Sequence, residues 1–270
     1  MKPLVSTDWL EKNLTKVRII DGSWHMPDSN RNPLEEFKKN HIQNSVFFDL
    51  DKNSNQSSDL PHMLPEKTHW ERLNSDHGIK NSDHIIIYDN SDVISSCRWW
   101  FSYLFFGHDP DLVSVLDGGY KKWVLEKKKV TCEIKVFEKS KYVAQEKKLV
   151  FDKQQIIENI NIKKFLVVDA RGAKRFHGIS PEPRKGLKSG NIEGSKNLPF
   201  QNCINLKDNS FKNKEELKRI FNDFMIINTK EKVFSCGSGV TACILGLANS
   251  IISGKTPLVY DGSWADYGRE

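Results

Sequence analysis

The chain repeats one pattern of short apolar segments, and this repeat limits its fold more than any other feature of the sequence. In the first half, Asp21 ends one such segment and Asp89 ends the next, 68 positions later. In the second half, Asp169 and Cys236 end the matching segments, 67 positions apart. An Asp-Gly pair then follows in both halves, 28 positions after Asp89 and 25 positions after Cys236. These matched distances predict two copies of one domain of about 120 to 130 residues.

The segments between these landmarks alternate between two patterns of hydrophobicity. Residues 85–88 and 165–168 are short apolar runs rich in β-branched residues, which is typical of buried strands. Residues 99–106 are bulky and apolar on all sides, and residues 214–224 carry apolar side chains along one helical face. Strands that alternate with helices predict an α/β fold of two tandem domains, each a mainly parallel sheet flanked by helices. Ligands bind such sheets beyond the carboxyl ends of the strands.

The composition excludes several classes of protein. The chain has 270 residues, and 41 basic against 35 acidic side chains give a formal net charge of +6. Its scattered lysines indicate a solvated surface rather than a nucleic-acid interface. Asp8 and Glu11 precede any apolar run at the N-terminus, so we expect neither a signal peptide nor a membrane span. Five cysteines without a Cys-x-x-Cys pair predict reduced thiols, a cytoplasmic protein and no metal site.

A lysine-rich stretch at residues 126–148 separates the two copies. Its composition is typical of an exposed connector. We therefore expect an N-terminal domain at residues 1–138, a linker at 139–149 and a C-terminal domain at 150–270.

Cys236 stands at the end of an expected strand and directly before a glycine-rich turn. Residues 233–242 read Val-Phe-Ser-Cys-Gly-Ser-Gly-Val-Thr-Ala, and an apolar, alanine-rich segment with a helical pattern follows. The backbone N–H groups of such a turn converge at the positive end of the helix, where they stabilise a thiolate and hold an anion. A cysteine can also be a simple core residue. The glycine-rich setting favours a nucleophile here, whereas the other four cysteines lack it and are expected to be structural.

Only the second copy has this nucleophile. At the matched position the first copy has Asp89, and a second carboxylate at Asp92 makes its loop a poor anion site. The N-terminal domain is therefore expected to be inactive, with the cleft between domains as the binding site. Cysteine phosphatases need an arginine after five intervening residues to hold phosphate. Ala242 stands there, and no arginine or lysine occurs in residues 237–254, which argues against phosphoryl transfer.

Segments along nearly the whole chain resemble one family. Residues 236–241, Cys-Gly-Ser-Gly-Val-Thr, resemble the active-site loop of 3-mercaptopyruvate sulfurtransferases, the two-domain branch of the rhodanese superfamily. Thiosulfate-using rhodaneses typically have basic residues directly after the cysteine, where this chain has Gly237 and Ser238. Six further segments resemble the family in order and spacing: residues 47–51, 59–65, 116–119, 175–178, 181–184 and 260–264. The resemblance implies two tandem rhodanese-like domains.

The resemblance also implies the reaction and its main residues. Cys236 would take sulfane sulfur from 3-mercaptopyruvate as a persulfide, release pyruvate and pass the sulfur to a thiol, thioredoxin or cyanide. Arg175 and Arg184 would hold the carboxylate and keto oxygen of the substrate, because guanidinium groups present planar paired donors. Backbone N–H groups of the loop would stabilise the thiolate and the persulfide. The remaining binding residues implied in this loop are Gly237, Gly239, Val240 and Thr241.

A proton relay of Ser238, His62 and Asp51 completes the implied site. Asp51 and His62 come from the first copy, so the site would need both domains. Each residue also has a plainer interpretation: loop arginines are usually at the surface, a lone histidine is often a capping residue, and Ser238 is a common turn residue. No organic cofactor is implied.

Two other functions remain open from the sequence. The first is a thiosulfate sulfurtransferase of the same fold. The second is a non-catalytic tandem module that binds a partner or senses sulfur through Cys236.

Overall fold

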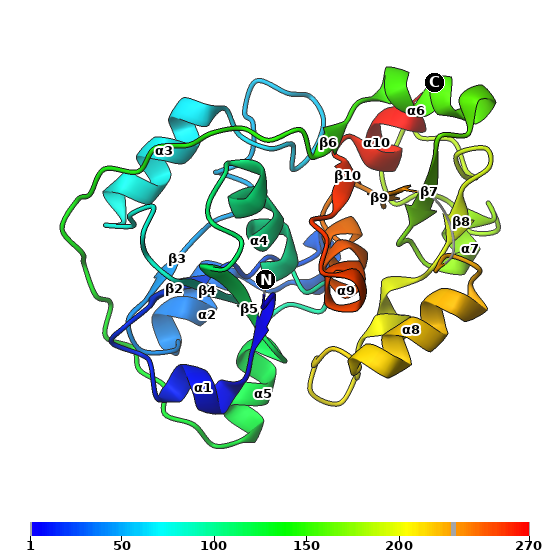
Figure 1. The fold of residues 1–270 in the computed structure, drawn as a ribbon. Coiled ribbons are helices and arrows are strands. Elements are labelled where there is room, and N and C mark those ends of the chain that lie inside the picture. Colours follow the sequence, from blue (N-terminus) through cyan, green and yellow to red (C-terminus); the bar gives the residue numbers. More distant parts are fainter. Residues whose placement is uncertain (1, 228–230, 270) are drawn as a thin grey trace. The chain divides into compact units, whose positions relative to one another are not determined.

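The structure is a computed structural model that describes residues 2–227 and 231–269 (Figure 1). The chain forms two compact units, each built around one five-stranded sheet. Unit 1 consists of Met1–Gln56, Leu64–Lys147 and Leu206–Phe211, and unit 2 of Ser57–Met63, Lys148–Asn205 and Lys212–Glu270. All strand pairs within both sheets are parallel, as the alternation of strands and helices predicts.

The sheet of unit 1 has the strand order β1-β5-β4-β2-β3. Its strands are β1 (Leu4–Val5), β2 (Arg18–Asp21), β3 (Ser45–Phe47), β4 (Ile85–Tyr88) and β5 (Val113–Leu116). Its helices are α1 (Thr7–Glu11), η1 (Pro27–Ser29), α2 (Pro33–Lys39), α3 (Lys67–Asp76), α4 (Ser96–Phe105) and α5 (Gly119–Leu125). All four residues of β4 are buried, because a central parallel strand is covered on both faces.

The sheet of unit 2 has the strand order β6-β10-β9-β7-β8. Its strands are β6 (Val150–Phe151), β7 (Phe165–Asp169), β8 (Lys196–Asn197), β9 (Glu231–Ser235) and β10 (Leu258–Tyr260). Its helices are α6 (Lys153–Ile162), α7 (Ala173–Phe176), η2 (Phe200–Cys203), α8 (Lys214–Asp223), α9 (Ala242–Ser253) and α10 (Ser263–Tyr267). The two sheets have the same order position for position, so the predicted repeat and the predicted fold class are confirmed.

Each unit has its own apolar core. In unit 1, α4 is buried from Ser96 to Leu104, and Trp70 of α3 stacks on Phe106 with ring centroids 4.8 Å apart. In unit 2, α9 is buried from Ala242 to Ala248 and packs on β9 and β10. Both helices follow the central strands β4 and β9, so their burial fixes the loops that join them to those strands.

The predicted domain boundaries and the two units differ in several short segments. Residues 139–147, expected in the linker, lie in unit 1, where the buried Tyr142 is hydrogen-bonded to His108 Nδ1 at 3.1 Å. Ser57–Met63 lies in unit 2 and Leu206–Phe211 in unit 1. These assignments depend on contacts between residues far apart in sequence, which local composition does not encode.

Candidate active site

Cys236 lies directly after β9, at the carboxyl end of the central strand of unit 2. Its side chain is buried, with a 2% exposed fraction. The loop then turns at Gly239, whose φ of +77° is a conformation that favours glycine. The backbone of α10 holds this loop, since the N–H of Trp264 donates to Cys236 O at 3.0 Å and that of Ala265 to Gly237 O at 2.9 Å.

The loop leaves several backbone donors available. The N–H groups of Cys236 and Gly239 both donate to the side chain of Ser263. Within residues 2–227 and 231–269, four further N–H groups of the loop have no hydrogen-bond acceptor: those of Gly237, Ser238, Val240 and Thr241. They precede the twelve-residue helix α9, whose positive end adds to their effect. Such an arrangement can stabilise a negative charge on sulfur.

His62 contacts this loop. Its Nδ1 lies 2.9 Å from Ser238 Oγ, and both side chains are buried. The segment that carries His62 comes from the first half of the sequence but belongs to unit 2, where Arg269 pairs with Asp59. The φ of His62 is +59°, an uncommon conformation for a residue with a Cβ. Two of the three predicted relay residues are therefore brought together.

Asp51 belongs to the other unit. There its two carboxylate oxygens accept hydrogen bonds from Trp24 Nε1 at 3.0 and 3.1 Å. A connection between Asp51 and His62, which the predicted relay requires, remains a prediction.

Arg175 and Arg184 lie over the active-site loop. A Cβ placed on Gly237 would be 3.2 Å from Arg175 Nη2 and 3.7 Å from Arg184 Nη1. A Cβ at this position would crowd the guanidinium group of Arg175 and would be in ordinary van der Waals contact with that of Arg184, so both groups lie close to the backbone next to Cys236. The arrangement places two guanidinium groups beside Gly237, the residue after Cys236, and guanidinium groups bind carboxylates.

Glu182 orients Arg175, a role that the sequence does not predict. Its carboxylate accepts hydrogen bonds from Arg175 Nε at 3.2 Å and Nη2 at 2.5 Å, and from Arg171 Nη1 at 2.7 Å. Its side chain is only 2% exposed. Arg171 in turn pairs with Asp169 at 2.7 Å and packs over the ring of Trp264 at 4.2 Å. The position of Glu182 in the Pro-Glu-Pro-Arg segment was the available signal.

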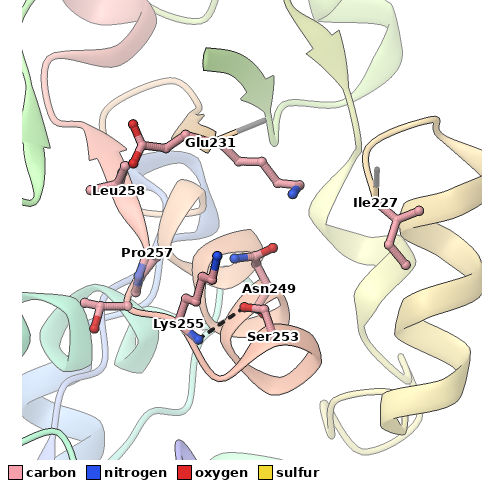
Figure 2. Close-up of a pocket in the computed structure, with 9 residues that line it drawn as sticks. Ile227, Glu231, Asn249, Ser253, Lys255, Pro257 and Leu258 are labelled. Atoms are coloured by element: carbon pink, nitrogen blue, oxygen red, sulfur yellow. Dashed lines mark hydrogen bonds between the residues drawn. The ribbon is translucent and has the colours of Figure 1, made fainter. Parts of the chain in front are cut away.

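The cavity in Figure 2 lies elsewhere in unit 2. It has a volume of about 570 Å³ and is lined by residues such as Lys232 of β9, Leu258 of β10 and Lys255. Lys232 and Leu258 lie toward the amino ends of their strands, whereas Cys236 follows the carboxyl end of β9. The cavity therefore does not include the candidate nucleophile.

Two further features are absent from the described residues. In the described residues, no three His, Cys, Asp or Glu side chains lie together so that they could hold a metal ion. Across residues 2–227 and 231–269, no helix has the length and hydrophobicity needed to cross a bilayer.

Comparison with known proteins agrees with this geometry. The family model for the rhodanese-like domain matches twice, at residues 6–126 and 152–270. The 3-mercaptopyruvate sulfurtransferase of Mus musculus is 36% identical over 276 residues, covering 98% of this chain and 92% of the relative. The thiosulfate sulfurtransferase of Rattus norvegicus is 34% identical over 278 residues, covering 99% and 92%.

A solved structure shows the same architecture. The crystal structure of SseA from Escherichia coli, described as a 3-mercaptopyruvate sulfotransferase, superimposes with a TM-score of 0.87 at 28% identity. The match covers 98% of this chain and 99% of SseA. The chain therefore belongs to the rhodanese family and contains two rhodanese-like domains in tandem.

Proposed function

We propose that the chain is a 3-mercaptopyruvate sulfurtransferase that works through a persulfide on Cys236. The observation that carries this proposal is the pair of guanidinium groups over Gly237, next to a buried cysteine in a loop rich in N–H donors. The relatives with that name support it, because they align over nearly the full length of both chains.

In the first step the Cys236 thiolate attacks the sulfur of 3-mercaptopyruvate. A sulfur–sulfur bond forms, the carbon–sulfur bond breaks, and its electron pair passes to carbon as the enolate of pyruvate. One proton then converts the enolate to pyruvate. In the second step an acceptor thiolate attacks the outer sulfur and regenerates the Cys236 thiolate.

The surrounding residues supply charge and protons. Arg175 and Arg184 bind the carboxylate and keto oxygen, and so stabilise the negative charge that develops on the enolate. Ser238 and His62, in hydrogen-bond contact at 2.9 Å, are placed to move a proton between the substrate and the enolate. Asp51 is proposed to complete this relay by orienting His62.

The acceptor and the location are proposals of the same kind. A small thiol or thioredoxin suits a nucleophilic attack on the persulfide, and cyanide would serve as an artificial acceptor. All five cysteines lie in the described residues and none is in a disulfide, which supports a reducing compartment such as the cytoplasm. One relative is named as mitochondrial, so cell fractionation is the appropriate test.

A mass measurement tests the reaction directly. Incubation with 3-mercaptopyruvate and no acceptor should add one sulfur, about 32 Da, to the peptide that contains Cys236. Cys236→Ser should remain unlabelled, and a label on that variant would contradict the proposal.

A thiosulfate sulfurtransferase is the second candidate, favoured by the relatives of that name. Comparison of kcat/KM for the two donors distinguishes them, and a much larger value for thiosulfate would reverse our preference. If the persulfide forms but no acceptor discharges it, a sulfur-sensing or partner-binding module replaces both enzymes.

A further inference from the structure

Ser263 holds two positions of the loop that carries Cys236. Its Oγ accepts a hydrogen bond from the N–H of Cys236 at 3.1 Å and another from that of Gly239 at 3.1 Å. The hydroxyl itself donates to Tyr260 O at 2.8 Å. The single donor and both lone pairs of the hydroxyl are therefore used, and they connect the loop after β9 to the turn before α10.

The backbone of Ser263 is in a conformation that favours glycine. Its φ is +51°, which is uncommon for a residue with a Cβ. The residue is also fully buried, so the hydrogen bonds of its hydroxyl are made within the protein. The matched position in unit 1 is Gly119, with a φ of +53°. Unit 1 thus shows that glycine is sufficient for this turn. The serine in unit 2 needs another reason, because a strained side-chain-bearing residue persists only where the surroundings require it.

The hydroxyl divides the N–H groups of the loop into two sets. Those of Cys236 and Gly239 are directed to Ser263. The four N–H groups that have no hydrogen-bond acceptor in the described part of the chain lie between and after these two positions. Fixing both positions limits the rotation of the peptide planes between them. The side chain of Ser263 therefore determines which donors remain for the sulfur.

We propose that Ser263 is a positioning residue for the Cys236 thiolate and persulfide. It acts through the loop, without contact with the substrate. The proposal depends on the proposed function only in taking Cys236 as the reacting thiol.

The test is the pH dependence of Cys236 alkylation by iodoacetamide, measured by mass spectrometry without any sulfur donor. Ser263→Ala and Ser263→Gly are compared with the parent in a Cys132→Ser background, because Cys132 is exposed. Ser250→Ala is the matched control: it removes another buried hydroxyl of unit 2, which bonds Gly246 O and Lys255 O and not the loop.

We expect both Ser263 variants to alkylate about tenfold more slowly at pH 7 and to need a higher pH to reach the rate of the parent. Ser250→Ala should keep the parent profile. The glycine variant is decisive, because it removes the hydroxyl while the backbone conformation remains favourable. If Ser263→Ala does not fold, Ser263→Gly still gives the answer.

An unchanged profile in Ser263→Gly would overturn the proposal, as would an equal shift in Ser250→Ala. The outcome is independent of the sulfur donor. If the parent forms no persulfide but Ser263→Gly still shifts the titration, the proposed function fails and the role of Ser263 stands. If the parent forms the persulfide and the profile of Ser263→Gly is unchanged, only the role of Ser263 fails.

Discussion

The loops after β4 and β9 occupy the same place in two sheets of identical order, yet their backbone donors are satisfied in opposite ways. After β4, the Asp89 carboxylate accepts the N–H groups of Ser91 at 3.0 Å and Ser96 at 3.3 Å. After β9, Cys236 has a thiol at that position, and the hydroxyl of Ser263 comes from another element to hold the loop. In unit 1 the carboxylate at the strand end accepts hydrogen bonds from the N–H groups of its own loop. In unit 2 the N–H groups near the thiol stay available.

The difference supports the prediction that only the second copy is reactive. The buried Asp89 has a raised pKa because burial disfavours its charge, although Ser91 and Ser96 oppose this effect. The N–H groups of Ser91 and Ser96 are therefore not available to bind an anion. In the loop after β9, the N–H groups of Gly237, Ser238, Val240 and Thr241 have no hydrogen-bond acceptor within the described residues.

The largest expected effect comes from exchanging the two strand-end residues. Cys236→Ser should reduce sulfur transfer by about 10⁴-fold or more, since the nucleophile is lost. Asp89→Cys combined with Cys236→Ser should not restore it, because residues 90–92 read Asn-Ser-Asp, with a second carboxylate at Asp92, instead of a glycine-rich turn. Persulfide formation and turnover are measured for both variants, and transfer by the double variant would break the comparison.

A second prediction concerns Arg175, one of the two arginines near Gly237 in the loop of unit 2. Arg175→Lys keeps the charge but loses the planar pair of donors and the pairing with Glu182. We expect kcat/KM for 3-mercaptopyruvate to fall by about 10²-fold. Lys174→Ala, on the same short helix and exposed, is the control and should remain close to the parent. Equal losses in the two variants would contradict a specific role for Arg175.

A third prediction concerns the turn that holds each loop. A Cβ on Gly119 would lie 2.5 Å from Asp89 O, and its φ is positive. Gly119→Ala should therefore lower the free energy of unfolding by about 2 kcal/mol. Gly172→Ala is the control, because a Cβ there meets nothing within 4 Å and its φ is −58°. Chemical denaturation measures both, and an unaffected Gly119 variant would show that the turn can move.

The smallest effect involves the aspartates that end β2 and β7. Asp169 is paired with Arg171, whereas Asp21 has Ser23 at the matched position. Burial raises the pKa of Asp21 to about 7, although hydrogen bonds from Ser23 oppose the shift. The folded protein therefore holds a proton that the unfolded chain releases above its ordinary pKa of 3.8.

The stabilising contribution of this proton is fully present below pH 3.8 and is lost as the pH rises through about 7. Asp21→Asn removes this dependence, so its advantage over the parent should grow by about 1 kcal/mol between pH 5 and 6. Thermal unfolding across this range tests the sign. A constant difference between the two proteins would show that Asp21 does not titrate there.

Local patterns in the sequence predict the elements well. The helix expected around residues 99–106 is α4 (Ser96–Phe105), and the one expected at 214–224 is α8 (Lys214–Asp223). The strand, turn and helix around Cys236 also have the expected order. These features depend on hydrophobic periodicity and on glycine, which act over a few neighbouring residues.

Contacts between residues far apart in the sequence do not follow from local patterns. His62 and Ser238 are 176 positions apart, and the sequence alone placed His62 with the first domain. Glu182 and Ser263 lie in ordinary-looking segments, and only folding shows that one orients Arg175 and the other holds the loop.

The sequence by itself therefore predicted two parallel-sheet domains, which the structure confirms, and one reactive thiol at Cys236, which stays a prediction. The tertiary structure decided which charges and donors surround that thiol. The physical reason is that strands and helices follow from local patterns, whereas a buried hydrogen bond or ion pair forms only where the packing of distant segments brings its partners into contact.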